Sequence, residues 1–240
     1  MERVRLEVVG KQYFRLQRMD FLSNNRRRQG EKSRWFWSVK DVSLLLEGGQ
    51  WLGVVGANGS GKTTLLRIIA GVTAPTHGTV VVNGRIVSLL ELFAGMQSDL
   101  TGRENIFLNG LLLGMRRHEI RRKFNSIVEF AGIGDFLDMP LKHYSTGMAM
   151  RIGFSVGLHV EAQIFLIDEA WSVGDSAFQE KSLGRLLSLS RQGAGVILVT
   201  HDLGIIRKYA TETLWLDRGS VAGFGGSGPI LQSYLRSNLP

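Results

Sequence analysis

The sequence predicts an α/β fold with a mostly parallel sheet, N-terminal antiparallel strands and an inserted helical subdomain. Two apolar runs, residues 164–167 and 195–200, have the length of buried strands, and residues 176–192 between them favour a helix. This βαβ order implies parallel strands, because the helix returns the chain to the same end of the sheet. From residue 92 to residue 160 the pattern is mainly helical, which indicates helices inserted into the α/β core.

The predicted organisation is a single domain over residues 1–240. Its α/β core is expected to comprise residues 1–91 and 161–240, and its helical subdomain residues 92–160. With 240 residues, 44% of them hydrophobic, the chain can build a sizeable core.

The N-terminal region contains two strand candidates separated by a basic stretch. Residues 3–9 alternate polar and apolar side chains, as an edge strand would, and residues 39–46 form a second candidate. Residues 15–34 between them show no clear period, so we expect an inserted loop there. In the aromatic cluster at 35–37, the rings could be buried in the core or could stack on a bound base; Tyr13 is an alternative for stacking.

A glycine-rich loop follows the short apolar strand predicted at residues 51–55. Residues 56–64 match the phosphate-binding pattern G-x-x-x-x-G-K-[ST] and lead into a helix-favouring run at 65–70. Glycines let backbone N–H groups converge on a phosphate, and the helix N-terminus adds partial positive charge. The predicted nucleotide-binding residues of this loop are Gly56, Ala57, Asn58, Gly59, Ser60, Gly61, Lys62, Thr63 and Thr64.

Two local signals mark the middle of the chain. Residues 79–83 and 85–90 favour short strands, and the Asn-Gly pair at 83–84 between them predicts a β-hairpin. Thr101, with Glu104 three positions later, predicts a capped helix start.

Polar side chains follow two of the predicted parallel strands. Asp168 and Glu169 end one strand, and His201 follows the other. Ligands bind at the carboxyl ends of such strands, so these groups should lie beside the glycine loop. Asp168 and the Thr63 hydroxyl would then hold Mg²⁺, Lys62 would reach the β- and γ-phosphates, and Glu169 would polarise the attacking water. His201 could contact the γ-phosphate, although a lone histidine after a strand is usually an ordinary polar residue.

A second candidate anion site lies within the predicted helical subdomain. Residues 144–148, Tyr-Ser-Thr-Gly-Met, place a hydroxyl and a bare glycine amide at the start of an amphipathic helix that extends to about residue 158. One glycine loop already serves the phosphates of one nucleotide. The second site is therefore best explained if it acts in trans, on a nucleotide held by another copy of the chain. The residues predicted to act in trans are Ser145, Thr146, Gly147 and Met148.

The chain carries a formal net charge of +8 and no cysteine. The positive charge suits either nucleic acid or an anionic membrane leaflet, and composition alone does not choose between them. The arginine-rich stretch at 116–123 has the spacing of a solvated helix face. No run of eighteen apolar residues and no signal-peptide pattern occurs, so we expect a cytosolic chain unless a partner holds it elsewhere.

These motifs resemble those of ATP-binding subunits of ABC transporters, over about residues 37–223. The signature of that family is usually Leu-Ser-Gly-Gly-Gln; residues 144–148 keep the serine and the second glycine and replace three positions. The Tyr-Ser-x-Gly-Met form, together with residues 89–92, 99–105 and 168–175, resembles the branch that exports bacterial polysaccharides, namely O-antigen, capsule and teichoic acid.

The resemblance implies roles for the matched residues. The implied catalytic residues are Glu169 as base, His201 as γ-phosphate switch and Lys62, and the implied metal ligands are Thr63 and Asp168. Ser145 and Gly147 would act in trans, and the Gly174-Asp175 loop would communicate across a dimer.

One departure from the family pattern concerns a glutamine between the core strands and the helical subdomain. It has no clear counterpart, and both Glu91 and Gln97 lie in the right neighbourhood; we take Glu91 as the candidate metal contact. For the adenine-stacking ring, the candidates are Trp35 and Tyr13.

The expected function is that of an ATPase with ATP and Mg²⁺ as cofactors. By resemblance, it would form a head-to-tail dimer with a second copy and drive a separate transmembrane permease that exports a lipid-linked polysaccharide. It would sit peripherally on the cytoplasmic face of the cell membrane, with residues 92–101 as the docking surface and no nucleic acid partner. Residues 228–235 would form a short closing helix, and we expect no direct recognition of the glycan. The alternatives are a soluble ABC ATPase acting on nucleic acid or ribosomes, and a drug or lipid exporter subunit.

Overall fold

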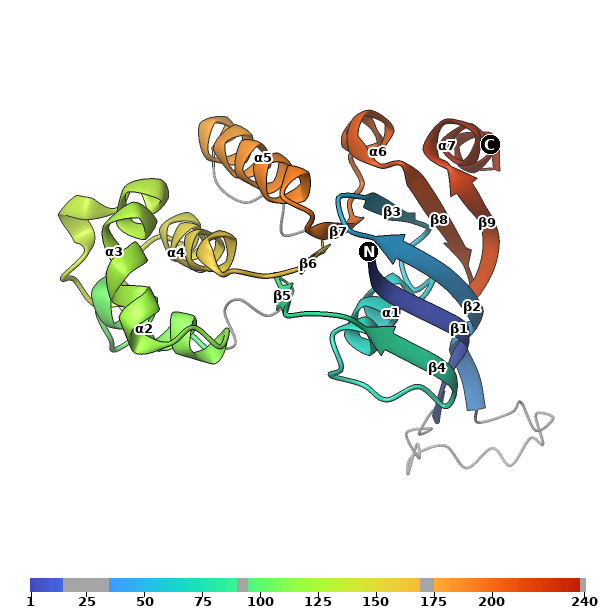
Figure 1. Ribbon diagram of the computed structural model, residues 1–240, viewed down its shortest axis with the longest axis horizontal. Helices are drawn as coiled ribbons and strands as arrows, with labels where there is room; N and C mark the ends of the chain where they lie inside the picture. The colour runs from blue at the N-terminus through green and yellow to red at the C-terminus, as the bar shows by residue number, and fades with distance from the viewer. Residues whose placement is uncertain (15–34, 90–94, 169–174, 238–240) are drawn as a thin grey trace, which may run out of the picture.

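The computed structural model describes residues 1–14, 35–89, 95–168 and 175–237 (Figure 1). Within them, the strands form one sheet in the order β4-β1-β2-β9-β8-β3-β7-β6-β5. The strands are β1 (Glu2–Phe14), β2 (Trp35–Glu47), β3 (Trp51–Val55), β4 (His77–Val82), β5 (Ile86–Ser88), β6 (Ile164–Asp168), β7 (Gly195–Val199), β8 (Glu212–Asp217) and β9 (Ser220–Gly226). The helices are α1 (Lys62–Ile69), α2 (Gly102–Leu112), α3 (Arg117–Ala131), α4 (Thr146–His159), α5 (Ser176–Arg191), α6 (Leu203–Tyr209) and α7 (Ser227–Ser237), with short 3-10 helices at Gly134–Phe136 and Leu141–His143.

The centre of the sheet is parallel, as predicted. Strands β8, β3, β7, β6 and β5 run in the same direction, whereas β1 pairs antiparallel with both β2 and β4. All residues of β3 and β7 are buried, because α1 and the N-terminal strands cover one face of the parallel part and the other helices cover the opposite face. The predicted βαβ unit is formed by β6, α5 and β7. The fold class expected from the sequence is confirmed.

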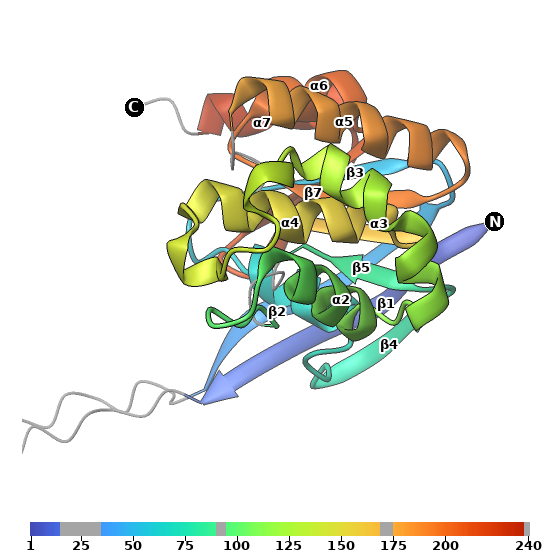
Figure 2. The ribbon, with the colours of Figure 1, turned by 90° about the vertical axis from the view of Figure 1, so that its left-hand side faces the viewer.

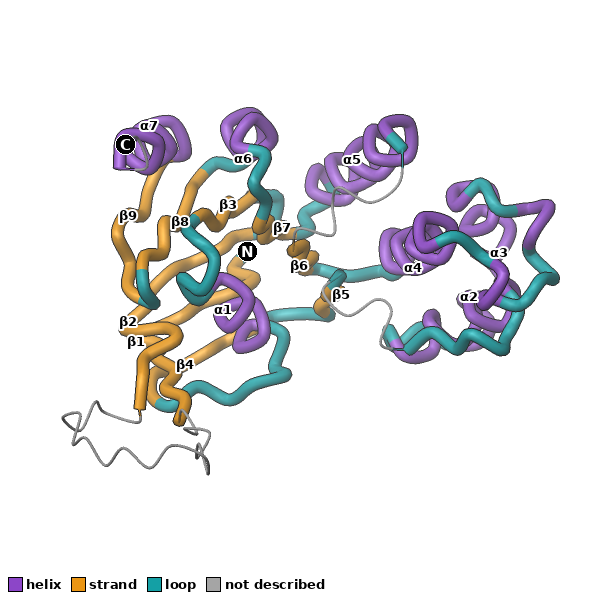
Figure 3. The backbone as a smooth tube through the Cα atoms, turned by 180° about the vertical axis from the view of Figure 1, so that it is seen from behind, coloured by secondary structure: helices purple, strands orange, loops and turns teal. Residues whose placement is uncertain are grey.

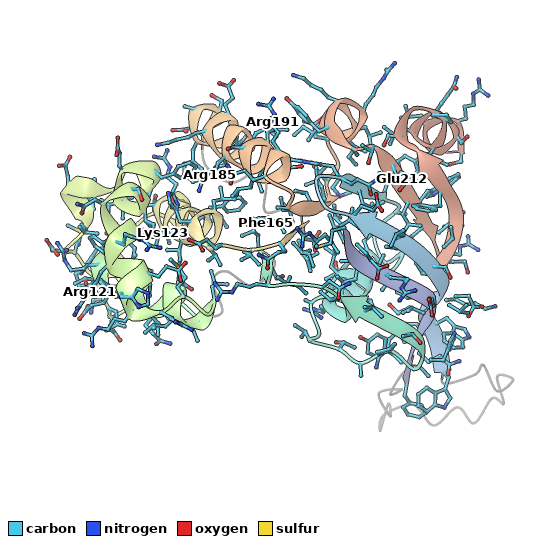
Figure 4. All side chains as sticks on the ribbon, viewed as in Figure 1. Arg121, Lys123, Phe165, Arg185, Arg191 and Glu212 are labelled. Atoms are coloured by element: carbon cyan, nitrogen blue, oxygen red, sulfur yellow. The ribbon has the colours of Figure 1, made fainter. Side chains whose placement is uncertain are left out.

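Alternate residues of the central strands enter two separate hydrophobic layers. In β6, Ile164 and Leu166 pack with α1 and the N-terminal strands, while Phe165 and Ile167 pack on the opposite face with the remaining helices. Figure 2 shows α5, α6 and α7 along one side of the sheet, and Figure 4 labels Phe165 between sheet and helices. The strand period of two thus explains why a continuous apolar run is required here.

The predicted hairpin around Asn83 and Gly84 is wrong. Strand β4 pairs with β1 at one edge of the sheet, and β5 pairs with β6 at the other edge. Gly84 has φ +121°, and a Cβ there would lie 2.6 Å from the Cβ of Gln163. Gly84 therefore lets the backbone pass close to Gln163 where the chain crosses from β4 at one edge of the sheet to β5 at the other.

Strand β1 is not an edge strand, because β4 and β2 flank it. Its alternating pattern reflects one solvated face: Val4 and Leu6 are buried, whereas Arg5 and Glu7 are exposed. Alternation reports a half-buried sheet and carries no information about which strand is outermost.

Helices α2, α3 and α4 pack together beside the sheet, at one end of the molecule (Figure 3). The start of α2 has the predicted capping box, in which Thr101 accepts from the backbone N–H of Glu104 and the Glu104 carboxylate accepts from that of Thr101. Among the helices of the described residues, none has the length and apolar content needed to span a membrane.

Candidate functional site

The loop between β3 and α1 has a backbone that only glycine adopts easily. Gly59 and Gly61 have φ of +80° and +107°, in the left-handed region. A Cβ on Gly61 would lie 2.1 Å from the carbonyl oxygen of Ser38, so the loop is pressed against β2. By contrast, nothing lies within 4 Å of the Cβ position of Gly59, which faces open space. The loop thus leaves room for a ligand on one side only.

Lys62 lies inside this loop, with only 8% of the residue exposed. Its Nζ donates to the carbonyl oxygens of Gly56 at 2.8 Å and Ala57 at 3.1 Å. The buried hydroxyl of Ser60 has no hydrogen-bond partner among the described residues. A cation held by carbonyls, together with an unused hydroxyl at a helix N-terminus, fits a bound phosphate.

Thr63 and Asp168 are 105 positions apart in sequence, and their side chains meet. The Thr63 hydroxyl donates to Asp168 Oδ2 at 3.1 Å, because α1 starts and β6 ends at the same edge of the sheet. A hydroxyl and a carboxylate are hard oxygen ligands of the kind that Mg²⁺ prefers. In the described part of the chain, no three His, Cys, Asp or Glu side chains gather as a metal site. The residues present therefore fit an ion that takes its other ligands from phosphate and water.

These residues line one pocket of about 450 Å³. That volume is within the range of small-molecule sites. Its lining residues are Phe36, Ser38, Asn58, Gly59, Gly61, Lys62, Thr63, Thr64 and Asp168. The Ser38 hydroxyl donates to Thr64 Oγ1 at 2.8 Å and so ties β2 to α1 at the pocket wall.

The aromatic ring on the pocket wall belongs to Phe36, whereas Trp35 and Tyr13 are not among the lining residues. Phe36 and Ser38 share a face of β2 because side chains alternate along a strand, which turns Trp35 to the other face. The Tyr13 ring packs behind Phe36, with 6.1 Å between ring centroids. Side chains two positions apart on a strand share a face, so Phe36 lies on the same face as the pocket-lining Ser38. This spacing is the sequence signal that could have pointed to Phe36.

Phe36→Ala is expected to weaken ATP binding by roughly tenfold or more, because it removes the aromatic ring that lines the pocket and is the candidate for stacking on the base. The matched variants Trp35→Ala and Tyr13→Ala should change the Kd much less. Titration with a fluorescent ATP analogue measures all three. A larger loss in either control than in Phe36→Ala would contradict the assignment of Phe36.

His201 follows β7, which lies between β3 and β6. In the strand register, Val199 is opposite both Val54 and Asp168, so His201 emerges at the edge where the glycine loop and Asp168 lie. It is not among the residues that line the pocket itself. Glu169 and Glu91 lie outside the described residues.

Ser145 is the N-cap of α4, and its Oγ accepts from the backbone N–H of Met148 at 3.2 Å. Ser145 and Thr146 are exposed, and Gly147 and Met148 are partly exposed. None of the four residues lines the glycine-loop pocket. The predicted second anion site is therefore exposed and separate from the glycine-loop pocket of its own chain.

Asp175 connects the start of α5 to α4. Its Oδ1 accepts from the backbone N–H of Phe178 at 2.9 Å, and its Oδ2 lies 2.6 Å from Arg151 Nη2. The Phe178 N–H, followed by the Arg151 charge, lowers the pKa of Asp175 below its usual value. Gly174 lies outside the described residues.

The segment that holds Gln97 is fixed to α2 by the buried Asn105. Asn105 Nδ2 donates to the carbonyls of Gln97, Leu100 and Thr101, and its Oδ1 accepts from the Gln97 N–H at 2.9 Å. Gln97 is not among the residues that line the pocket.

The ABC transporter family model matches residues 39–172, more than half of the chain. This chain belongs to the ABC transporter family. It is 40% identical over 208 residues to the O-antigen export system ATP-binding protein RfbB of Myxococcus xanthus, covering 87% of this chain and 48% of that protein. It is 39% identical over 206 residues to the teichoic acids export ATP-binding protein TagH of Listeria innocua, covering 86% and 61%. A Klebsiella pneumoniae RfbB is 39% identical over 85% of this chain and 82% of its own length.

Solved structures show the same fold. An ATP-binding subunit of an ABC transporter superposes with a TM-score of 0.77 at 19% identity, over 99% of this chain and 95% of the other. The dimeric post-hydrolysis cassette MJ0796, bound to ADP and Pi, superposes with a TM-score of 0.74 at 24% identity, over 93% and 98%. The chain spans about half to two thirds of the length of several curated relatives that it matches.

Proposed function

We propose that this chain is the ATPase subunit of an ABC exporter that moves a lipid-linked polysaccharide across the cytoplasmic membrane. The observation that carries the proposal is the pocket in which the glycine loop, Lys62 and the Thr63–Asp168 pair converge. The class of cargo rests on relatives whose names specify O-antigen export and teichoic acid export.

The geometry of the pocket supports a mechanism for ATP hydrolysis. Lys62 already points into the loop that would surround the phosphates, so its charge can offset negative charge that develops there. Thr63 and Asp168 would hold Mg²⁺, which when bound neutralises charge on the phosphate oxygens. Glu169, next along the chain, would be the general base that orients and deprotonates the attacking water.

A second copy of the chain would complete the site. Residues 145–148 form an exposed helix start with N–H groups and a hydroxyl, suited to an anion, yet they lie off the pocket of their own chain. In a head-to-tail dimer, each glycine loop would face the partner's residues 145–148 across the nucleotide. Loss of the γ-phosphate would remove that bridge and open the interface, which is how hydrolysis would drive movement.

The membrane partner would dock on the helical subdomain that we assign to residues 92–160. Residues 95–101 of the expected docking segment are held in place by Asn105, and the nearby Leu111 and Leu112 are 50% and 62% exposed. Leu112 packs at Gly95, whose Cβ position lies 2.2 Å from Leu112 Cδ1. A segment anchored by these hydrogen bonds, with exposed leucines beside it, is suited to bind a partner segment, and it would hold the chain peripherally at the cytoplasmic face of the membrane.

Size-exclusion chromatography with light scattering tests the ATPase part of the proposal. Glu169→Gln should form dimers only with Mg·ATP, and its turnover should fall by roughly a hundredfold or more, because the amide cannot act as a base. If the variant hydrolyses ATP at the rate of the unmodified chain, Glu169 is not the base.

Deletion of the gene in its own host tests the cargo class. Lipid-linked polysaccharide should accumulate on the cytoplasmic side of the membrane, and the unmodified chain but not Glu169→Gln should restore its export. A deletion strain with normal surface polysaccharide would contradict the assigned cargo. Steeply salt-dependent binding of the purified chain to RNA or DNA would favour the alternative role on nucleic acid.

A further inference from the structure

A polar pocket lies where α3, α4 and α5 meet, at the amino-terminal end of β6. The glycine-loop pocket lies at the opposite, carboxyl end of that strand and shares no lining residue with it. The pocket between α3, α4 and α5 has a volume of about 480 Å³, and we call it the basic pocket. An adjoining hollow of about 430 Å³ shares Lys123, His159 and Arg185 with it. The basic pocket is lined by Lys123, Ser126, Glu129, Phe130, His159, Lys181 and Arg185.

Two positively charged side chains of α5, Lys181 and Arg185, line the basic pocket and have no carboxylate partner among the described residues. Lys181 Nζ donates to the carbonyls of Glu129 and Phe130, each at 3.2 Å, and Arg185 Nε donates to the Leu158 carbonyl at 3.3 Å. These carbonyls belong to the last turns of α3 and α4, whose partial negative charge offsets only part of the two positive charges. The terminal nitrogens of Arg185 make no hydrogen bond within the described residues.

The third cation, Lys123, is neutralised locally. Its Nζ lies 3.1 Å from Glu119 Oε1 and 2.8 Å from Glu161 Oε1. The acidic side chain on the wall itself is Glu129. After these pairings, the positive charges of Lys181 and Arg185 still exceed the negative charge on the wall.

His159 forms the floor of the pocket and is 9% exposed. Its Nδ1 lies 2.6 Å from the Ser155 carbonyl oxygen, so Nδ1 carries the hydrogen and Nε2 is left without a partner among the described residues. Burial, then the charges of Arg185, Lys123 and Lys181, lower the pKa of His159, while its hydrogen bond to Ser155 opposes them. The ring is therefore neutral at pH 7, and Nε2 becomes a hydrogen-bond donor to an anion only when the ring takes up a proton.

We propose that the basic pocket binds a phosphate-type oxyanion, held by Lys181 and Arg185 with Nε2 of His159 beneath it. The oxyanion would accept hydrogen bonds from the ammonium and guanidinium groups, which are the strongest kind for this ligand. Because Lys123, His159 and Arg185 come from α3, α4 and α5, the ligand would bridge all three helices. Figure 4 labels Lys123 and Arg185. Helix α4 carries Ser145 at its other end, so ligation would also stiffen the support of that residue.

Sulfate is the first probe, since it keeps two negative charges at both pH 6 and pH 8. The Lys62→Ala substitution weakens competing binding at the glycine loop. In this variant of the 240-residue chain, the His159 ring resonances should shift saturably with sulfate. They are assigned by comparison with His159→Gln. Bound sulfate favours the protonated His159 ring and so raises its pKa. By linkage, sulfate should bind more tightly at pH 6 than at pH 8, with a gain in affinity of up to about tenfold for each unit by which the pKa of His159 rises. Lys123, Lys181, Arg185 and Arg3 face this ring or its adjoining hollow, with Glu129 and Glu161 as the acidic groups.

Arg185→Met and Lys181→Met should each weaken sulfate binding by about tenfold, because each variant loses a charged hydrogen bond to the ion. Arg191→Met is the matched control: it removes an exposed arginine from the same helix, and Arg191 lines neither hollow (Figure 4). Its sulfate affinity should be unchanged. If no saturable shift of His159 occurs, or if Arg191→Met loses as much affinity as Arg185→Met, the proposal is overturned. The resonance measurement does not depend on the methionine variants being folded.

Two further probes identify the source of the oxyanion. The source is a soluble phosphate compound if inorganic phosphate produces the same shift and the chain does not prefer vesicles of phosphatidylglycerol over vesicles of phosphatidylcholine. Binding to phosphatidylglycerol vesicles that is lost in Arg185→Met and kept in Arg191→Met indicates a lipid headgroup. Vesicle binding that both variants retain would place the lipid contact elsewhere and exclude the lipid source for this pocket.

Discussion

Asp168→Ala is expected to abolish Mg²⁺-dependent ATP hydrolysis, lowering turnover by roughly a thousandfold or more, because several kcal/mol of transition-state stabilisation depend on the metal. In the structure, Asp168 meets the Thr63 hydroxyl at 3.1 Å and lines the pocket. Its removal leaves the hydroxyl alone, and one neutral ligand holds Mg²⁺ weakly. Phosphate release measured over a range of Mg²⁺ concentrations tests this prediction.

The control for Asp168→Ala is Asp217→Asn. Asp217 is an exposed carboxylate at the end of β8, another parallel strand of the same sheet, and it does not line the pocket. Its replacement should leave the rate unchanged. Thr63→Ser should retain activity because it keeps the hydroxyl, whereas Thr63→Val keeps the shape and should lose it. Normal turnover of Asp168→Ala at saturating Mg²⁺ would remove Asp168 from the metal site.

The core of the site could be predicted from sequence because it depends on local patterns and on one rule of topology. The glycine loop is a contiguous motif, and Asp168 follows from the rule that parallel strands end at one edge. The Thr63–Asp168 contact, which spans 105 positions, was therefore foreseeable. The βαβ unit was foreseeable for the same reason, since it is local in sequence.

The failures arose where a local signal has more than one tertiary use. An Asn-Gly pair favours a hairpin turn, but Gly84 instead allows a close passage beside Gln163 between opposite sheet edges. Among the three adjacent aromatic residues, composition could not tell which ring lines the pocket, because that depends on which face of β2 meets the glycine loop. The basic pocket was invisible for a similar reason: Lys123, His159 and Arg185 come from three helices and form no sequence motif.

Gly147→Asp is expected to lower turnover sharply while leaving the fold and ATP binding by the same chain intact. The Cβ position of Gly147 meets nothing closer than Ser145 Oγ at 3.9 Å, so a side chain fits. An aspartate in the first turn of α4 should even stabilise the helix, by about 0.3–1 kcal/mol. Across a dimer interface, however, the same carboxylate would repel the phosphates held by the partner. Turnover should therefore fall by about a hundredfold or more, where each factor of ten corresponds to an increase of about 1.4 kcal/mol in the activation free energy.

Mixing variants distinguishes an in-trans role of Gly147 from a role within its own chain. Lys62→Ala lacks a working glycine loop but keeps residues 145–148, whereas Gly147→Asp has the opposite defect. In a mixed dimer, one site combines the intact loop of one copy with the intact helix start of the other. Two inactive proteins should thus regain turnover on mixing, with up to about a quarter of the sites active after random pairing into two-fold dimers. A residue that acts within its own chain cannot be supplied by a partner. A mixture that forms ATP-dependent mixed dimers but regains no turnover would therefore show that Gly147 does not act in trans.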